Sequence, residues 1–74
     1  MPRKVEVPPE LEKAVDVLLD VGISNNRAKD LFRYALVKRC IEREGGNQAG
    51  AAKKLGMQRT QITGLVELLE TRLS

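Results

Sequence analysis

The chain contains no histidine, no tryptophan and a single cysteine, Cys40. One cysteine cannot form a disulfide within the chain, and without histidine the usual ligands of a structural zinc site are missing. The carboxylates form no catalytic pair, and the glycines form no phosphate-binding loop. We therefore expect no enzymatic activity, no catalytic residue, no metal, no cofactor and no small-molecule ligand.

Long apolar runs are also absent. No stretch approaches the roughly 20 apolar residues that cross a bilayer, and the opening Met-Pro-Arg-Lys lacks the apolar run of a signal peptide. A small chain with one cysteine fits a reducing compartment. These absences predict a soluble cytoplasmic protein that does not contact a membrane.

The length of 74 residues allows one small domain. A core of this size rarely contributes more than about 3–5 kcal/mol of stability, so such domains usually need a disulfide, a metal or a partner chain. Because the first two are excluded or disfavoured, a second copy of the chain is the expected source of extra stability.

The basic charge is concentrated in the second half of the chain. Thirteen basic and ten acidic side chains give a net charge of +3, and the whole excess lies after residue 37. No acidic side chain occurs between Glu44 and Glu67, whereas Lys53, Lys54 and Arg59 lie inside that interval. We expect an anionic partner to meet this segment first.

The apolar spacing predicts an all-α fold with four helices. Residues 1–8, with Arg3 and Lys4, form a basic tail before helices expected at about 9–21, 25–44, 48–55 and 59–73. Glycines follow the first three helices, and a serine or asparagine precedes the second and the third. β-Branched residues never alternate over a bounded run, so no strand is predicted.

The predicted helix at 25–44 is apolar on two opposite sides. Ala28, Leu31, Phe32 and Ala35 share one side, whereas Tyr34, Val37 and Ile41 lie on roughly the other. A helix of this kind needs something packed against each side. We assign Tyr34, Val37 and Ile41 to a homodimer interface.

Residues 47–69 have the spacing of a helix-turn-helix. Gly56 stands where the chain must turn between two helices, and a small residue, Ala52, precedes it by four positions, where the helices would cross closely. Apolar contacts come from both helices and the turn, at Ala51, Leu55, Met57, Ile62 and Leu65.

The outward side of the last helix carries hydrogen-bonding side chains that suit the base edges of the major groove. Arginine can bind guanine and glutamine can bind adenine in bidentate fashion, and the methyl group of threonine can touch thymine. The candidates for base contact are Gln58, Arg59, Thr60, Gln61 and Thr63. The candidates for phosphate contact are Asn47, Gln48, Lys53 and Lys54.

The run from Gly46 to Thr60, GNQAGAAKKLGMQRT, resembles the DNA-binding domain of the bacterial factor for inversion stimulation (Fis) family. The same kind of domain is the C-terminal domain of enhancer-binding activators of the nitrogen-regulatory type. The resemblance covers roughly residues 35–70. It implies a homodimer in which residues 9–46 form a two-helix dimerisation region, while residues 47–74 form a helix-turn-helix that grips and often bends double-stranded DNA. A regulator of transcription or a protein of the nucleoid is the function implied.

A second interpretation remains open. The end of the last helix is apolar and acidic: Glu67 and Glu70 lie beside an apolar stripe that forms either core or a protein interface, at Leu65, Val66, Leu68, Leu69 and Leu73. The same dimer scaffold could therefore serve as a protein-interaction module, which binds a protein partner or heterodimerises with a DNA-binding relative.

Overall fold

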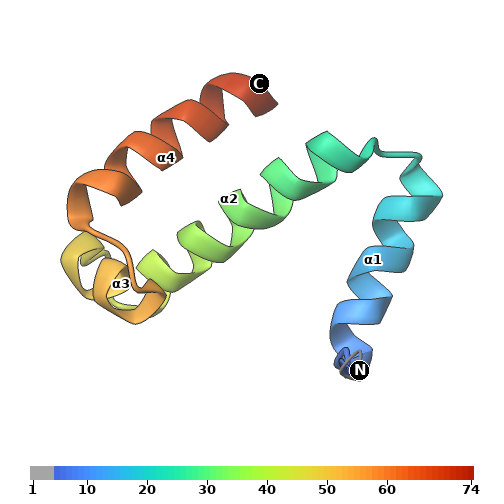
Figure 1. Cartoon of the computed structure of the whole chain (residues 1–74), viewed down its shortest axis with the longest axis horizontal. Coiled ribbons are helices and arrows are strands. Elements are labelled where there is room, and N and C mark those ends of the chain that lie inside the picture. The colour runs from blue at the N-terminus through green and yellow to red at the C-terminus, as the bar shows by residue number, and fades with distance from the viewer. Residues whose placement is uncertain (1–4) are drawn as a thin grey trace.

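Four helices follow one another along residues 5–74, the part of the chain that the structure, a computed structural model, describes. They are α1 (Pro9–Val21), α2 (Asn25–Arg43), α3 (Gln48–Leu55) and α4 (Arg59–Leu73), and no strand occurs within that range. The all-α fold expected from the sequence is confirmed. As Figure 1 shows, α4 runs back antiparallel to α2, α3 closes one end of this pair, and α1 leaves from the other end.

The helix ends lie where local capping residues place them. The hydroxyl of Ser24 accepts a hydrogen bond from the backbone N–H of Arg27 at 3.3 Å, and Oδ1 of Asn47 accepts one from the N–H of Gly50 at 3.1 Å. These bonds satisfy backbone donors that a first helical turn leaves without a partner. Gly22 ends α1 in the left-handed conformation, with φ of 81°.

The core lies between α2, α3 and α4. Val37 of α2, Ala51 and Ala52 of α3, and Ile62 of α4 are at most 3% exposed and form one cluster. Val37 precedes the predicted boundary at residues 46 and 47, so the packing of the helix-turn-helix extends back into α2.

The assignment of Tyr34, Val37 and Ile41 to a dimer interface is corrected here. This side of α2 faces α3 and α4 of the same chain: Val37 is 3% exposed, Ile41 packs against the core, and the hydroxyl of Tyr34 donates a hydrogen bond to Glu70 of α4. The uncovered side is the opposite one, where Phe32 and Leu36 are 49% and 48% exposed. Both sides are apolar, so the sequence pattern did not distinguish the side that the chain itself covers.

Helix α1 has no buried residue and diverges from α2 (Figure 1). An open apolar groove of about 510 Å³ lies between the two helices, with Leu11, Val15, Leu18 and Leu19 of α1 on one wall and Phe32 of α2 on the other. A helix of this length is marginal in water without packing. The groove therefore leaves the apolar side of α1 without cover within residues 5–74.

The predicted basic tail falls only partly within the described residues. Residues 5–8 form neither helix nor strand before α1 begins. The expectations for Arg3 and Lys4 lie outside the described residues.

Replacing Gly64 by alanine is expected to stabilise the fold by about 1 kcal/mol, because glycine in the middle of a helix has more conformational freedom to lose on folding. A Cβ at position 64 would meet nothing within 4 Å. The measurement is urea unfolding followed by circular dichroism at fixed protein concentration. Gly56→Ala is the contrasting control, because its φ of 67° strains any residue with a Cβ. The expectation fails if Gly64→Ala unfolds at the same urea concentration as the parent chain or at a lower one.

Candidate nucleic-acid interface

The turn between α3 and α4 brings the two helices close together. Gly56 adopts the left-handed conformation, and the backbone N–H of Met57 donates a hydrogen bond to the carbonyl of Ala52 at 2.8 Å. Ala52 is 3% exposed and Ile62 of α4 is fully buried beside it. Small side chains at this crossing let α4 project its first turn away from the core.

The first turn of α4 presents an arginine and a threonine to solvent. Arg59 and Thr60 are both exposed, and among residues 5–74 no carboxylate lies within 4 Å of the Arg59 guanidinium. Gln58, just before the helix, is exposed as well. An arginine with no carboxylate beside it keeps its forked set of donors available for a planar acceptor such as the guanine edge.

Two of the other candidates for base contact are engaged within the protein. Oε1 of Gln61 accepts a hydrogen bond from the backbone N–H of Gln58 at 2.8 Å, which caps α4. The hydroxyl of Thr63 donates to Oε1 of Gln48 at 2.9 Å and so joins α4 to the start of α3. Both side chains thus fix the position of the first turn of α4, and both residues are exposed.

The four phosphate candidates lie on or beside α3. Asn47 uses its side-chain oxygen to cap α3, and Gln48 is bound to Thr63. Lys53 is exposed, whereas Nζ of Lys54 lies 3.9 Å from Oε2 of Glu44. A pair at that distance, with the lysine side chain 68% exposed, is weak and is easily exchanged for a stronger anion.

Arg33 is a cation that the sequence pattern did not single out. It comes from α2 and shares a shallow depression of about 560 Å³ with Thr60 and Gly64 of α4. Its position beside the start of α4 depends on the packing of α2 against α4, which no local sequence signal specifies. It therefore joins the basic residues that flank this surface.

Three polar contacts join the C-terminal end of α4 to α2. Nη2 of Arg72 lies 3.0 Å from Oδ2 of Asp30, and Nη2 of Arg27 donates to the carbonyl of Leu73 at 3.1 Å. The hydroxyl of Tyr34 donates to Oε2 of Glu70 at 2.9 Å. These contacts hold α4 antiparallel to α2, so the direction of its exposed first turn is set by the fold.

The hydrogen bond to Glu70 raises the pKa of Tyr34 above its ordinary value of 10.0, with smaller contributions from desolvation and from the negative charge of Glu70. The stabilisation from this contact is complete below pH 10 and is lost as the pH rises through the raised pKa. Tyr34 is the sole tyrosine and there is no tryptophan, so the ultraviolet absorbance of its phenolate reports this one group. We expect a titration midpoint above 10.0 that falls toward 10.0 in Glu70→Ala. Equal midpoints in the two proteins would contradict this assignment.

Two further observations apply to residues 5–74. None of the helices there is both long enough and apolar enough to cross a membrane. No three acidic or cysteine side chains gather in that range as they would around a metal ion.

The crossing of α3 and α4 and the exposed first turn of α4 define a helix-turn-helix, the class of protein module that places one helix in the major groove of DNA. The family model described as "Bacterial regulatory protein, Fis family" matches residues 34–63, from the middle of α2 to the second turn of α4. This segment is a DNA-binding helix-turn-helix of the Fis type. No curated protein and no solved structure matches the chain.

Proposed function

We propose that the protein is a homodimer that binds double-stranded DNA with sequence preference, as a regulator of transcription or a nucleoid protein of the bacterial cytoplasm. The observation that carries the proposal is the Fis-type match over α3 and the first turn of α4, where Arg59 and Thr60 are exposed and Arg59 has no carboxylate within 4 Å among residues 5–74. In this proposal α4 enters the major groove with Arg59 as the main base reader, and α3 lies across the backbone.

The other predicted contact residues have different roles: some contact bases, some position α4 and some contact phosphates. Gln58 and Thr60 reach base edges beside Arg59, while Gln61 and Thr63 contribute chiefly by holding α4 in position. Lys53 and Lys54 meet phosphates, joined by Arg33 from α2, and Asn47 and Gln48 present the start of α3 to the backbone.

Homodimerisation is proposed through the groove between α1 and α2. Residues 9–46 then form the dimerisation region, residues 47–74 contain the helix-turn-helix and residues 1–8 are a tail. Support comes from the exposed apolar side chains of Phe32, Leu36, Val15 and Leu19, which are 49%, 48%, 43% and 67% exposed. Monomeric proteins rarely leave such contiguous surfaces open. Sedimentation equilibrium should give twice the chain mass of 8.2 kDa.

The experiment for DNA binding is a salt series with Arg59→Ala and Arg59→Lys beside the parent chain. A preferred site is first selected from random duplexes with the parent. We expect Arg59→Ala to lose about 1–3 kcal/mol of preference for that site. Arg59→Lys keeps the charge and therefore most of the salt dependence, but it is expected to weaken the preference, because the ammonium of lysine lacks the rigid planar fork with which a guanidinium holds the guanine edge. Equal preference in all three proteins would refute the role of Arg59.

One observation favours the second candidate function. Leu68 on the second half of α4 is 51% exposed, next to the exposed Glu67. A protein-interaction module would bind its partner through this end of α4. In that case the dimer would show no DNA binding even at low salt, and Arg59→Ala would leave partner binding unchanged.

A further inference from the structure

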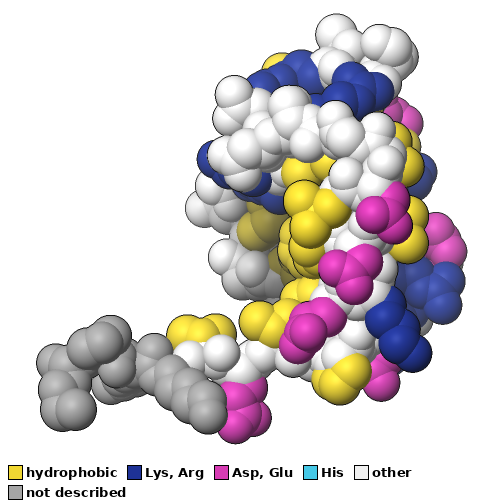
Figure 2. Space-filling model, turned by 90° about the vertical axis from the view of Figure 1, so that its right-hand side faces the viewer, with side chains coloured by type: hydrophobic (Ala, Val, Ile, Leu, Met, Phe, Trp, Pro, Cys, Tyr) yellow, Lys and Arg dark blue, Asp and Glu magenta, His cyan; other side chains and the backbone are white. Residues whose placement is uncertain are grey.

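Charge is segregated between the first two helices. Helix α1 carries four carboxylates and one lysine, and α2 carries six basic and two acidic side chains. The three ion pairs found within residues 5–74 do not involve α1. Figure 2 shows acidic side chains following one another beside an apolar strip on the side of the molecule where α1 lies. The four carboxylates of α1 thus form no ion pair within the described part of their own chain.

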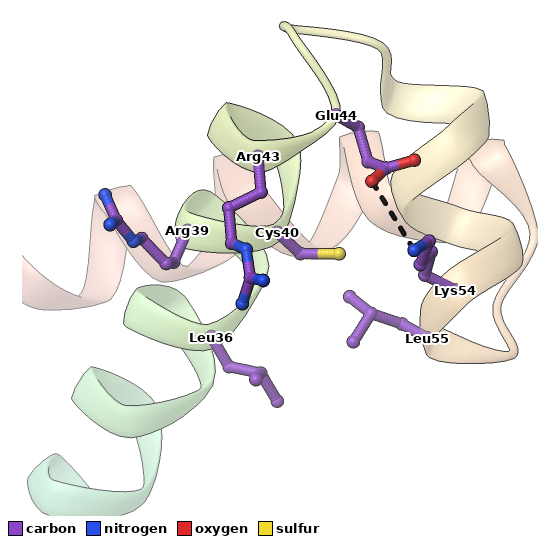
Figure 3. Close-up of a pocket in the computed structure, with 7 residues that line it drawn as sticks. All are labelled: Leu36, Arg39, Cys40, Arg43, Glu44, Lys54 and Leu55. Atoms are coloured by element: carbon purple, nitrogen blue, oxygen red, sulfur yellow. Dashed lines mark ion pairs between the residues drawn. The ribbon is translucent and has the colours of Figure 1, made fainter.

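A cationic pocket lies at the other end of α2. It has a volume of about 490 Å³ and an apolar floor of Leu36, Leu55 and the half-buried Cys40. The rim carries Arg39 and Arg43 from α2, Lys54 from α3 and one carboxylate, Glu44, at the end of α2 (Figure 3).

The basic groups of the rim are weakly compensated. Arg39 pairs with the exposed Glu42 at 3.3 Å, and Lys54 lies 3.9 Å from Glu44. Among residues 5–74 no carboxylate lies within 4 Å of the guanidinium of Arg43, which points over the apolar floor in Figure 3. The pocket therefore offers a cationic rim above an apolar floor, which suits a partner that is apolar and acidic at once.

The pocket and the apolar groove lie on the same side of α2. Phe32, Leu36, Arg39 and Arg43 follow one another at spacings of four, three and four residues, which places them in one line along the helix. Phe32 lines the groove and the last three line the pocket. One uncovered strip thus runs along α2, apolar in its first half and basic toward its end.

A second copy related by a two-fold axis brings these features together. In a two-fold contact the same patch is used by both copies. With the two-fold axis perpendicular to α2 at its apolar middle, the two α2 helices cross in opposite directions. The start of the second α2 then lies over the basic end of the first, and the α1 helix that leads into it arrives there too.

We propose that α1 of a second copy docks over the cationic pocket, with its carboxylates facing Arg39, Arg43 and Lys54 and its apolar side on Leu36 and Leu55. This inference rests on the proposed homodimer and adds a basis for self-recognition. A chain pairs with its own kind because each copy supplies both the acidic helix and the basic pocket. A related chain that lacks the acidic helix or the basic pocket is a poorer partner. Electrostatic complementarity contributes more to the choice of partner than to the strength of binding.

The test uses two charge-reversed full-length variants. In the first, Glu12→Lys and Asp16→Lys reverse α1; in the second, Arg39→Glu and Arg43→Glu reverse the pocket. Each variant alone is expected to dimerise about tenfold or more weakly than the parent chain, because like charges then face each other. An equimolar mixture is expected to recover the affinity of the parent, since both contacts of the heterodimer again join opposite charges. Glu67→Lys, a reversal on α4, is the control and is expected to leave dimerisation unchanged.

Cys40 supplies a second readout, because it is the only thiol in the chain and forms part of the pocket floor. Its reaction with a thiol reagent is expected to slow as the parent chain is concentrated into dimers. Each charge-reversed variant should react at the rate of the monomer over the same range.

Three outcomes would overturn the inference in distinguishable ways. A parent chain that stays monomeric removes the proposed homodimer and this inference with it. A dimeric parent whose variants dimerise within twofold of it retains the homodimer and removes the charge pairing. A mixture that gains nothing over the separate variants does the same, provided that circular dichroism shows each variant to keep the helix content of the parent chain.

Discussion

Replacing Ile62 by alanine is expected to lower the free energy of unfolding by about 3 kcal/mol, within the range of about 2–5 kcal/mol found for such truncations in tightly packed cores. Ile62 is fully buried and contacts the cluster of Val37, Ala51 and Ala52, which joins α2, α3 and α4. The loss approaches the whole stability of a domain this small. We therefore expect much of the variant to be unfolded at low protein concentration.

The measurement is circular dichroism during urea unfolding, at several protein concentrations. Leu68→Ala is the matched control, since it also shortens an apolar side chain of α4 but at a position that is 51% exposed; its expected change is within about 0.5 kcal/mol. If both variants unfolded at the same urea concentration, the cluster around Ile62 would not be the core that holds the three helices together.

The positions of the helices could be predicted because their signals are local. Pro9 suits the first turn of α1, Ser24 and Asn47 cap α2 and α3, and Gly22 and Gly56 take left-handed conformations at helix ends. Each of these signals depends on a few neighbouring residues and their backbone geometry. The long helix was expected to reach residue 44 and ends at Arg43, a difference of one residue.

The pairing of helix faces could not be predicted in the same way. Periodicity shows that α2 is apolar on two sides, but Val37 on one side and Phe32 on the other carry equivalent signals. The choice between them depends on the short connection from α2 to α3 and on the direction in which α4 returns, and both are properties of the whole chain. The outcome places Val37 in the core and leaves Phe32 49% exposed.

The same distinction between local signals and helix packing applies to the residues of the candidate site. Arg59 and Thr60 were predicted as exposed residues of the first turn of α4, and they lie there. The bond from Thr63 to Gln48 and the nearness of Arg33 to Gly64 depend on how helices cross, so the sequence alone did not indicate them.

In the proposed homodimer, the division of α2 into two faces links dimerisation to DNA binding. One face packs against α3 and α4 and so determines where α4 points, while the other is uncovered and is the face that we propose a second copy contacts. If the two α2 helices meet, the two α4 helices are held at a fixed separation, which is what a site with two half-sites requires. The second helix-turn-helix then binds from a high effective concentration.

Replacing Phe32 by aspartate is therefore expected to produce a folded monomer and to lower the affinity for a two-half-site duplex by about 100-fold to 10,000-fold, the gain that linked binding provides. Phe32 lies on the side of α2 opposite the core, so the charge disrupts the groove and leaves the helix-turn-helix intact. Sedimentation equilibrium and DNA titration at one salt concentration measure the two effects. Phe32→Leu keeps an apolar side chain and is expected to remain dimeric and bind like the parent. If Phe32→Asp is monomeric but binds the full site as tightly as the parent, DNA binding does not depend on dimerisation. If Phe32→Asp remains dimeric, the dimer interface does not lie in this groove.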